Sequence, residues 1–279
     1  SSGQMTIQIH HLKTLKKPKI SVITPAFNSA ATITDTIESV LTQSYPCVEH
    51  VIVDGGSTDG TVDIILRMER HYEGCLRWVS EPDGGLYDAM NKGIRMATGD
   101  VVGILNSDDF FTDEKSLKTV ADAFGNDTDA VFGNLKFVGR EDTEKVMRIW
   151  KGSPYRSFRK GWHPGHPTFY AKKSLYHDFG GFNTAFRIAA DFELMLRFIE
   201  KNRIRTRYLD RCLVDMRVGG TSTRSLRNII EGNREVMRAF TVNGIKVSPL
   251  YPLMRLLPKI HGLFTHNLLS TLLSDRGNG

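Results

Sequence analysis

The chain has 279 residues and a mass of 31.4 kDa, with 40% hydrophobic and 24% charged residues. These proportions are typical of a folded globular protein and exclude a wholly disordered or fibrous chain. The net charge is +6, and the basic excess is confined to residues 201–279, which hold 14 Lys and Arg against 5 Asp and Glu. This basic end predicts contact with a polyanionic surface or substrate.

Hydropathy and cysteine content favour a cytoplasmic protein. No apolar run reaches the roughly 18 residues that span a bilayer. Cys47, Cys75 and Cys212 are odd in number and far apart, so they predict neither a disulfide framework nor a metal knuckle. Residues 1–17 are interpreted as a tag remnant and tail, because Ser-Ser-Gly-Gln precedes Met5 and no signal peptide follows it.

The first half of the chain alternates short β-branched runs with amphipathic segments. Strands are expected at 20–24, 48–53, 76–80 and 101–105, with helices at 30–43, 58–72 and 85–97. Continuous apolar strands separated by such helices predict βαβ units and a mostly parallel sheet that is covered on both faces. The expected fold class is therefore α/β.

The second half is less regular. Residues 136–168 show no clear period and predict loops and short strands, whereas 189–201 predict a helix with Phe192, Leu196 and Ile199 on one face. No Pro- or Ser-rich linker separates domains. We therefore expect one catalytic domain over 18–222 and a basic, amphipathic helical extension over 223–279.

Polar residues follow each of the four expected strands, at the end where open parallel sheets bind ligands. The four segments are 24–28, 54–60, 81–85 and 106–109. A capping turn explains any one of them equally well. Four at one edge favour a ligand site.

Asp108 and Asp109 are adjacent carboxylates after a buried strand, an arrangement that is costly unless a cation compensates it. Their oxygen atoms suit Mg²⁺ or Mn²⁺. A P-loop NTPase and a dinucleotide-dependent oxidoreductase are disfavoured, because the glycine motifs of both classes are missing from the sequence.

Three motifs together resemble glycosyltransferase family 2: SVITPAFN at 21–28, VDGGSTDGT at 53–61 and LNSDD at 105–109. The segment SEPDGGLYDAMNKG at 80–93 is similar to bacterial members that build polysaccharide repeat units. The resemblance implies the GT-A fold, a Rossmann-like, mostly parallel sheet flanked by helices. It also implies an inverting, metal-dependent enzyme that moves a sugar from a nucleoside diphosphate to a glycan acceptor. Uridine is the preferred base, with guanosine and thymidine left open.

The resemblance assigns roles to individual residues. The implied nucleotide-binding residues are Pro25, Ala26, Phe27, Asn28, Asp54, Asp83, Asn106 and Ser107. Asp108, with Asp109 beside it, is the implied ligand of Mn²⁺ or Mg²⁺. Asn106 replaces the first Asp of the usual Asp-x-Asp motif, which predicts weaker metal binding.

The implied general base is Asp191, in a segment where Ala190 replaces the usual Glu; Glu193 is the alternative. His166 and Arg217 are implied contacts of the acceptor or of the diphosphate. A Pro- and Gly-rich turn with partly exposed histidines, and a solvated arginine at a strand end, are the simpler interpretations of these two residues.

Two other functions remain open: a nucleotidyltransferase, and a catalytically weak binding protein with the same fold. The acceptor implied by the resemblance is linked to a lipid, such as a polyprenyl diphosphate, and no nucleic-acid partner is expected. Apolar residues recur at three- and four-residue steps from Leu253 to Leu268, among Arg255 and Lys259. This pattern predicts a helix lying on an anionic membrane, with packing on the catalytic domain or a homodimer contact as alternatives.

Overall fold

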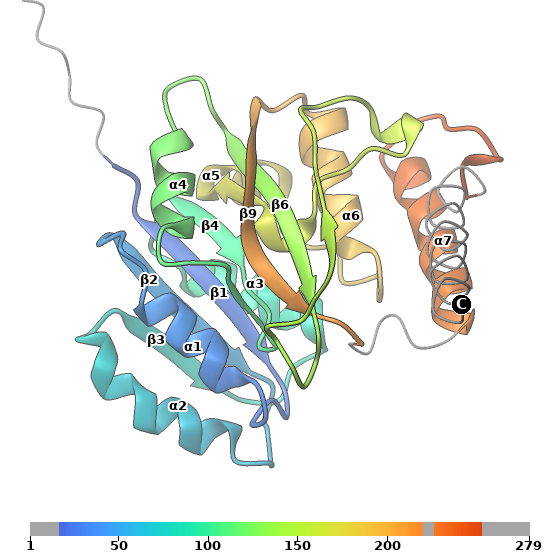
Figure 1. The fold of residues 1–279 in the computed structure, drawn as a ribbon. Helices are drawn as coiled ribbons and strands as arrows, with labels where there is room; N and C mark the ends of the chain where they lie inside the picture. Colours follow the sequence, from blue (N-terminus) through green and yellow to red (C-terminus); the bar gives the residue numbers. More distant parts are fainter. Residues whose placement is uncertain (1–16, 220–225, 253–279) are drawn as a thin grey trace, which may run out of the picture.

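The structure is a computed structural model that describes residues 17–219 and 226–252. The strands in these ranges form one sheet in the order β3-β2-β1-β4-β8-β6-β9-β5, and β7 pairs with β6 (Figure 1). The first four in chain order are β1 (Ile20–Ala26), β2 (Val48–Asp54), β3 (Leu76–Ser80) and β4 (Val101–Ile104). The others are β5 (Asp109–Phe111), β6 (Ala130–Val138), β7 (Val146–Trp150), β8 (Tyr170–Lys172) and β9 (Thr206–Arg217).

Strand direction places several strand ends together. β1 is parallel to both β2 and β4, whereas β8 is antiparallel to both β4 and β6. Because β9 is parallel to β6, the strands β1, β2, β4, β6 and β9 all point the same way. Their carboxyl ends lie along one side of the sheet, which we call the carboxyl edge.

Helices cover both faces of the sheet (Figure 1). One face carries α1 (Ile33–Leu41), α2 (Thr61–Glu69) and α4 (Ser116–Ala123). The other carries α3 (Leu86–Met96), α5 (Lys173–Phe179) and α6 (Ala190–Met195), with α7 (Leu226–Val242) packed outside α6. In α1, the apolar residues Ile33, Ile37 and Val40 recur at three- and four-residue steps and are buried, which fixes the helix on the sheet.

The predicted α/β fold and the alternating elements of the first half are confirmed. In the second half, the predicted helix at 189–201 is α6 followed by one π-helical turn, Leu196–Lys201. Short 3₁₀ turns lie at Arg70–Tyr72, Phe158–Lys160 and His166–Thr168. The sequence patterns did not predict α4, α5 or β9. The 12 residues of β9 include Arg207, Asp210 and Arg211, so they lack the apolar run of a strand buried on both faces.

The predicted C-terminal extension begins with a helix, α7. This helix packs on α6 through the rings of Phe192 and Phe240, which are 5.8 Å apart. Tyr251 lies behind Phe240 at a ring distance of 5.0 Å. The apolar stripe from Leu253 to Leu268, like the predicted tail up to residue 16, is outside the described residues. In the ranges that are described, no helix is long and apolar enough to cross a membrane.

Candidate active site

The turn after β1 and the loop after β2 interlock at the carboxyl edge. Asn28 adopts a φ of 48°, a left-handed conformation that Asn tolerates better than most residues. Its N–H donates to Ser57 Oγ at 2.8 Å, and the N–H of Thr58 donates to Asn28 Oδ1 at 2.9 Å. The turn leaves the ring of Phe27 64% exposed, an unusual state for a phenylalanine.

Asp54, at the end of β2, is fully buried. Its carboxylate accepts hydrogen bonds from the N–H groups of Gly56 and Ser57, at 3.1 and 2.9 Å, and from Ser80 Oγ at 2.7 Å. The hydroxyl of Ser57 also donates to it. The structure therefore gives Asp54 the role of shaping the loop that follows β2, instead of an open position at the edge.

Asp83 lies across the end of β2 because residue 55 is glycine. A Cβ atom on Gly55 would be only 2.7 Å from Asp83 Oδ2, so a side chain there would displace the carboxylate. The N–H of Gly85 holds the other oxygen, Asp83 Oδ1, at 2.8 Å. The predicted nucleotide residues on the loops after β1, β2 and β3 thus lie together.

The loop after β4 is tied to the start of α1. Ser29 Oγ and Ser107 Oγ are 2.7 Å apart, and Thr32 Oγ1 donates to the carbonyl of Ser107 at 2.8 Å. Within the loop, Asn106 Nδ2 donates to Asp109 Oδ2 at 3.2 Å. These contacts fix the acidic segment beside the turn that carries Phe27.

The acidic loop fits a divalent cation. Asp109 is buried, and this burial, with the adjacent charge of Asp108, raises the pKa of the Asp109 carboxyl well above its usual range. Asn106 Oδ1 and Asp109 Oδ1 are buried without a hydrogen-bond partner. Within the described residues no group of three His, Cys, Asp or Glu forms a metal site, so further ligands would come from substrate phosphate and water.

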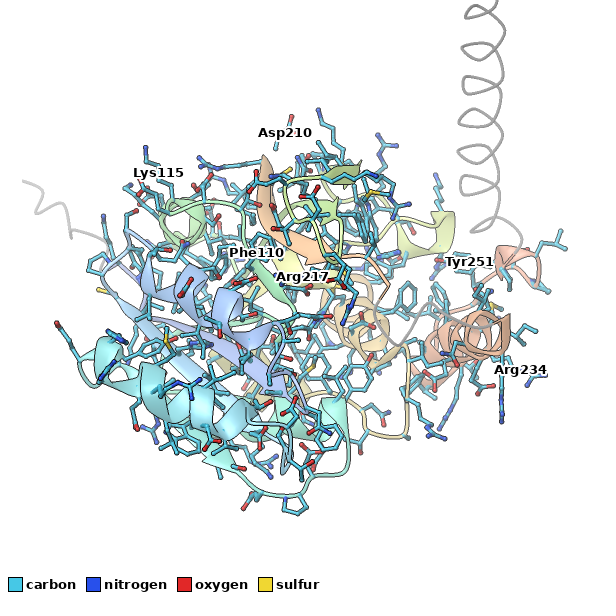
Figure 2. All side chains as sticks on the ribbon, turned by 60° about the horizontal axis from the view of Figure 1, so that its bottom comes forward. Phe110, Lys115, Asp210, Arg217, Arg234 and Tyr251 are labelled. Carbon is cyan, nitrogen blue, oxygen red and sulfur yellow. The ribbon has the colours of Figure 1, made fainter. Side chains whose placement is uncertain are left out.

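Arg217 has a different position from the one predicted. Its buried guanidinium donates to the carbonyl of Asp108 at 2.7 Å, pairs with Asp35, and lies 5.1 Å from the ring of Phe110 (Figure 2). Both terminal nitrogens thus have protein partners, so a solvated arginine does not describe it. Arg217 holds the backbone of the acidic loop.

Arg140 is a cation at the site that the sequence patterns did not indicate. Its Nη1 lies 3.8 Å from Asp108 Oδ2, and its side chain is 41% exposed. It follows β6, whose carboxyl end reaches the same edge only because β6 is parallel to β4. That long-range pairing has no local sequence signal.

Asp191 and His166 approach each other at the same edge. Because β8 is antiparallel to β4, the turn before β8, which carries His166, lies beyond the carboxyl end of β4. His166 Nδ1 is 4.0 Å from Asp191 Oδ2, and the Asp191 side chain is 33% exposed. Burial lowers the pKa of His166 despite the opposing effect of Asp191. His166 lies in the short turn His166–Thr168, and its side chain is 9% exposed.

Glu193 is engaged elsewhere. Arg197 binds both of its carboxylate oxygens at 2.9 Å, and Asn243 Nδ2 donates to one of them at 2.9 Å. The side chain is 3% exposed. This buried network leaves Glu193 no access to an acceptor and removes it as the alternative base.

Glu235 of α7 supports the segment before Asp191, a role that the sequence did not indicate. Its carboxylate accepts the N–H groups of Arg187, Ile188 and Ala189 at 2.7, 2.8 and 2.8 Å. Three otherwise unpaired donors at the start of α6 are thereby satisfied. The sequence signal is lacking because the contacts join residues 46 to 48 positions apart.

One hollow among the described residues lies away from these groups. It has a volume of about 970 Å³ and is lined in part by Pro18, Asp100, Val101 and Lys172. These residues mark the opposite edge of the sheet, where β1 and β4 begin. None of the predicted site residues lines this hollow.

The profile of the family described as Glycosyl transferase family 2 matches residues 21–192, which include the loops after β1, β2 and β4 and the Asp191 segment. The chain belongs to this family. As a family 2 glycosyltransferase it is an enzyme that transfers a sugar, which excludes the nucleotidyltransferase alternative.

Several known proteins are similar in sequence to parts of this glycosyltransferase. It is 35% identical over 185 residues to an uncharacterized glycosyltransferase of Mycobacterium tuberculosis, a match covering 64% of this chain and 68% of that protein. A PGL/p-HBAD biosynthesis glycosyltransferase of Mycobacterium bovis is 29% identical over 201 residues, or 69% and 74% of the two chains. TuaG of Bacillus subtilis, whose name refers to teichuronic acid biosynthesis, is 43% identical over 102 residues, 37% and 40% of the two chains.

Solved structures share the fold of this glycosyltransferase. S. aureus TarS in complex with UDP-GlcNAc matches with a TM-score of 0.64 and 22% identity, over 84% of this chain and 69% of that one. In the longer TarS structure the match spans 41% of the TarS chain. The mannosyltransferase PcManGT from Pyrobaculum calidifontis, in complex with GDP-Man and Mn²⁺, matches with a TM-score of 0.63 and 23% identity, over 95% and 77%. These likenesses confirm the GT-A fold.

Proposed function

We propose that this enzyme transfers a sugar, with inversion, from a nucleoside diphosphate sugar to a glycan acceptor in the synthesis of a bacterial surface polysaccharide or glycolipid. The observation that carries the proposal is the meeting, at one edge of the sheet, of an exposed aromatic ring, an acidic loop and a separate carboxylate. These are Phe27, the pair Asp108 and Asp109, and Asp191.

The nucleotide would bind over the loops after β1, β2 and β3. The exposed ring of Phe27 offers a stacking surface for the base, and Asp83 offers a carboxylate for a base or ribose donor. Asp54 acts on the loop through its four hydrogen bonds. UDP is the preferred carrier of the sugar. Because TarS is in complex with UDP-GlcNAc and PcManGT with GDP-Man, sugars of both nucleotides are included in the turnover experiment below.

Asp108, Asp109 and Asn106 would hold Mn²⁺ or Mg²⁺ together with the donor phosphates. The unpartnered oxygens of Asn106 and Asp109 support this assignment. When bound, the cation supplies positive charge to the departing diphosphate. Arg217 keeps the acidic loop in place, and Arg140 adds a cation beside Asp108.

Asp191 would take the proton from the acceptor hydroxyl as that oxygen attacks the anomeric carbon. His166 is neutral near pH 7, because burial lowers its pKa. The His166 ring therefore lies beside Asp191 without adding a positive charge that would neutralise its carboxylate. With Glu193 bound to Arg197, a single carboxylate is available on α6, which supports inversion in one displacement.

The enzyme would act at the cytoplasmic face of a membrane, on a lipid-linked acceptor. The names of the relatives, which refer to PGL and teichuronic acid biosynthesis, support an acceptor of this class. On α7, Ile229 and Ile230 are 47% and 54% exposed, and Arg234 points away from the domain (Figure 2). Exposed aliphatic and basic residues on one helix suit an anionic lipid surface.

Co-sedimentation with anionic vesicles tests the membrane proposal. The full chain is expected to bind at low salt, and a chain ending at residue 252, which keeps Tyr251 against Phe240, to bind more weakly. Arg234→Gln should reduce binding by both chains. If neither chain binds, the proposal fails; a dimer in light scattering would assign the surface to a second copy instead.

Donor turnover tests the proposed reaction. Release of nucleoside diphosphate is measured with UDP-GlcNAc, GDP-mannose and dTDP-rhamnose, each with Mn²⁺ and with a chelator. One donor is expected to be hydrolysed slowly with metal and not without it. Absence of turnover and of binding for every donor would overturn the proposal.

A further inference from the structure

A second hollow lies at the end of β7 and along the chain that follows it, between Trp150 and His163. β9 occupies one side of β6, so β8 and β7 must share the other, β8 against Ala130 and Val131 and β7 against the segment from Leu135 to Val138. The chain between β7 and β8 therefore returns along the same side of β6 toward His166. This segment borders an open hollow of about 430 Å³.

Aromatic rings form the walls of this hollow: Trp150, Trp162 and His163 line it. Both tryptophans are partly exposed. Trp162 is held by hydrogen bonds from Nε1 to the carbonyl and hydroxyl of Ser153, at 3.2 and 3.1 Å, and by the ring of Phe158 at 5.4 Å. Trp162 is therefore held in place before any ligand arrives, which lowers the entropic cost of binding.

The hollow is connected to the candidate base through two ring contacts. The His163 ring lies 5.0 Å from that of Trp150 and 5.5 Å from that of Phe192, edge-on in both cases. Phe192 directly follows Asp191 and donates its N–H to that carboxylate at 2.8 Å. The rings of His163 and Phe192 thus join the hollow to the helix that carries Asp191.

The surroundings of the hollow are basic. Residues 145–177 hold eight Lys and Arg and no Asp or Glu. Of the two cations that line the hollow, Lys151 pairs with Asp210 at 3.3 Å. Arg156 is exposed and has no hydrogen-bond or ion-pair partner within the described ranges. Its guanidinium is available to an anionic group.

We propose that this hollow binds a sugar residue of the acceptor glycan, with the sugar ring against Trp150 and Trp162 and a phosphate group at Arg156. The C–H faces of a pyranose ring pack well on indole, and its hydroxyls stay near water at the open side. The proposal rests on the proposed transferase function, since it assigns the hollow to the acceptor of that reaction.

Fluorine NMR of the 5-fluorotryptophan protein tests the proposal with an internal control. The chain has 3 tryptophans, and Trp78 lies on β3, at the far side of the sheet. The probes are the 1-phosphates of N-acetylglucosamine, galactose and mannose, their neutral methyl glycosides and inorganic phosphate. We expect at least one sugar to shift the Trp150 and Trp162 resonances saturably at millimolar concentration, with Trp78 unchanged. Shifts of all three signals together, or of none with any probe, would overturn the proposal.

Arg156→Gln isolates the phosphate contact. The variant should raise the Kd of the sugar 1-phosphate about tenfold, to that of the neutral glycoside, and leave the glycoside unaffected. Lys160→Gln, an exposed cation that does not line the hollow, is the matched control. Equal weakening by both variants would assign the effect to general charge and contradict a specific contact.

Calorimetry with the donor separates this proposal from the proposed function. If UDP and GDP sugars bind with Mn²⁺ and leave the Trp150 and Trp162 signals unchanged, the donor site and the hollow are distinct. If no donor binds but a sugar still shifts the Trp150 and Trp162 signals, the result would contradict the proposed donor site and not the proposed sugar site. Donor binding without any sugar shift would contradict the hollow alone.

Discussion

The acidic pair after β4 combines one accessible and one buried carboxylate. Asp108 is 31% exposed and faces Arg140, whereas Asp109 is buried beside Asn106. Asp108→Asn is expected to abolish turnover and metal-dependent nucleotide binding, because it removes the accessible charged ligand. Asp109→Asn should reduce both less. Calorimetry of UDP and GDP with and without Mn²⁺ measures the difference, and near-wild-type binding by Asp108→Asn would contradict the metal assignment.

Asp191 and Glu193 lie on one helical turn and have opposite environments. Asp191→Asn should leave donor affinity unchanged and lower kcat by roughly 10²–10⁴, the usual contribution of a positioned base. Glu193→Gln is the matched control: by disturbing the Arg197 and Asn243 contacts it should lower the melting temperature instead. Steady-state kinetics and thermal unfolding of both variants check this. A larger loss of kcat in Glu193→Gln at equal stability would transfer the role.

His50 links stability to pH. It is fully buried in β2, 2.8 Å from Thr24 Oγ1 and 2.5 Å from Tyr72 OH, and burial lowers its pKa to about 3. Below its usual pKa the unfolded chain binds a proton that the folded chain does not, so stability falls as pH drops from about 6.5 toward 3.

The expected contribution of His50 is a loss of about 1.4 kcal/mol per pH unit in the free energy of unfolding. Denaturant unfolding at several pH values between about 6 and 4.5 measures the slope, and His50→Gln should show a shallower one. Identical slopes in the two proteins would show that His50 is not the group responsible. His166, whose pKa is also lowered by burial, contributes in the same direction in both.

At the scale of elements, α7 supports from outside the segment that precedes Asp191. The Glu235 carboxylate accepts three N–H groups just before Asp191, and an amide offers them a single acceptor oxygen. Glu235→Gln is therefore expected to cost about 1–3 kcal/mol of stability and to lower kcat while donor affinity stays unchanged. Glu231→Gln, an exposed neighbour on the same helix, should do neither. Loss of stability at unchanged kcat would limit Glu235 to a structural role.

The elements also show which parts of the site are readable from sequence. The loops after β1, β2 and β4 follow apolar strands with a clear pattern, so their place at one edge is predictable. The position of Arg217 depends on the pairing of β9 with β5, and that of Arg140 on the direction of β6. Such long-range pairings leave no local pattern. The sequence resemblance favours Asp191 over Glu193 as the base, but only the structure shows that Arg197 binds both carboxylate oxygens of Glu193.

At the scale of the whole molecule, the two edges of the sheet differ in kind. The carboxyl edge carries the acidic loop, the exposed ring of Phe27 and the pair Asp191 and His166. The opposite edge carries the larger hollow of about 970 Å³, lined by none of these residues. Strand direction and the chemistry of the residues favour the carboxyl edge for the proposed donor site, although the hollow at the opposite edge has the larger volume of the two described here.

A crystal structure with a nucleoside diphosphate and Mn²⁺, located by its anomalous signal, tests the central claim most directly. We expect the manganese peak at Asp108, with the diphosphate beside it, the base against Phe27, and Asp191 facing the position of the missing sugar. Nucleotide or manganese bound in the hollow between Pro18, Asp100 and Lys172, with the carboxyl edge unchanged, would contradict the account.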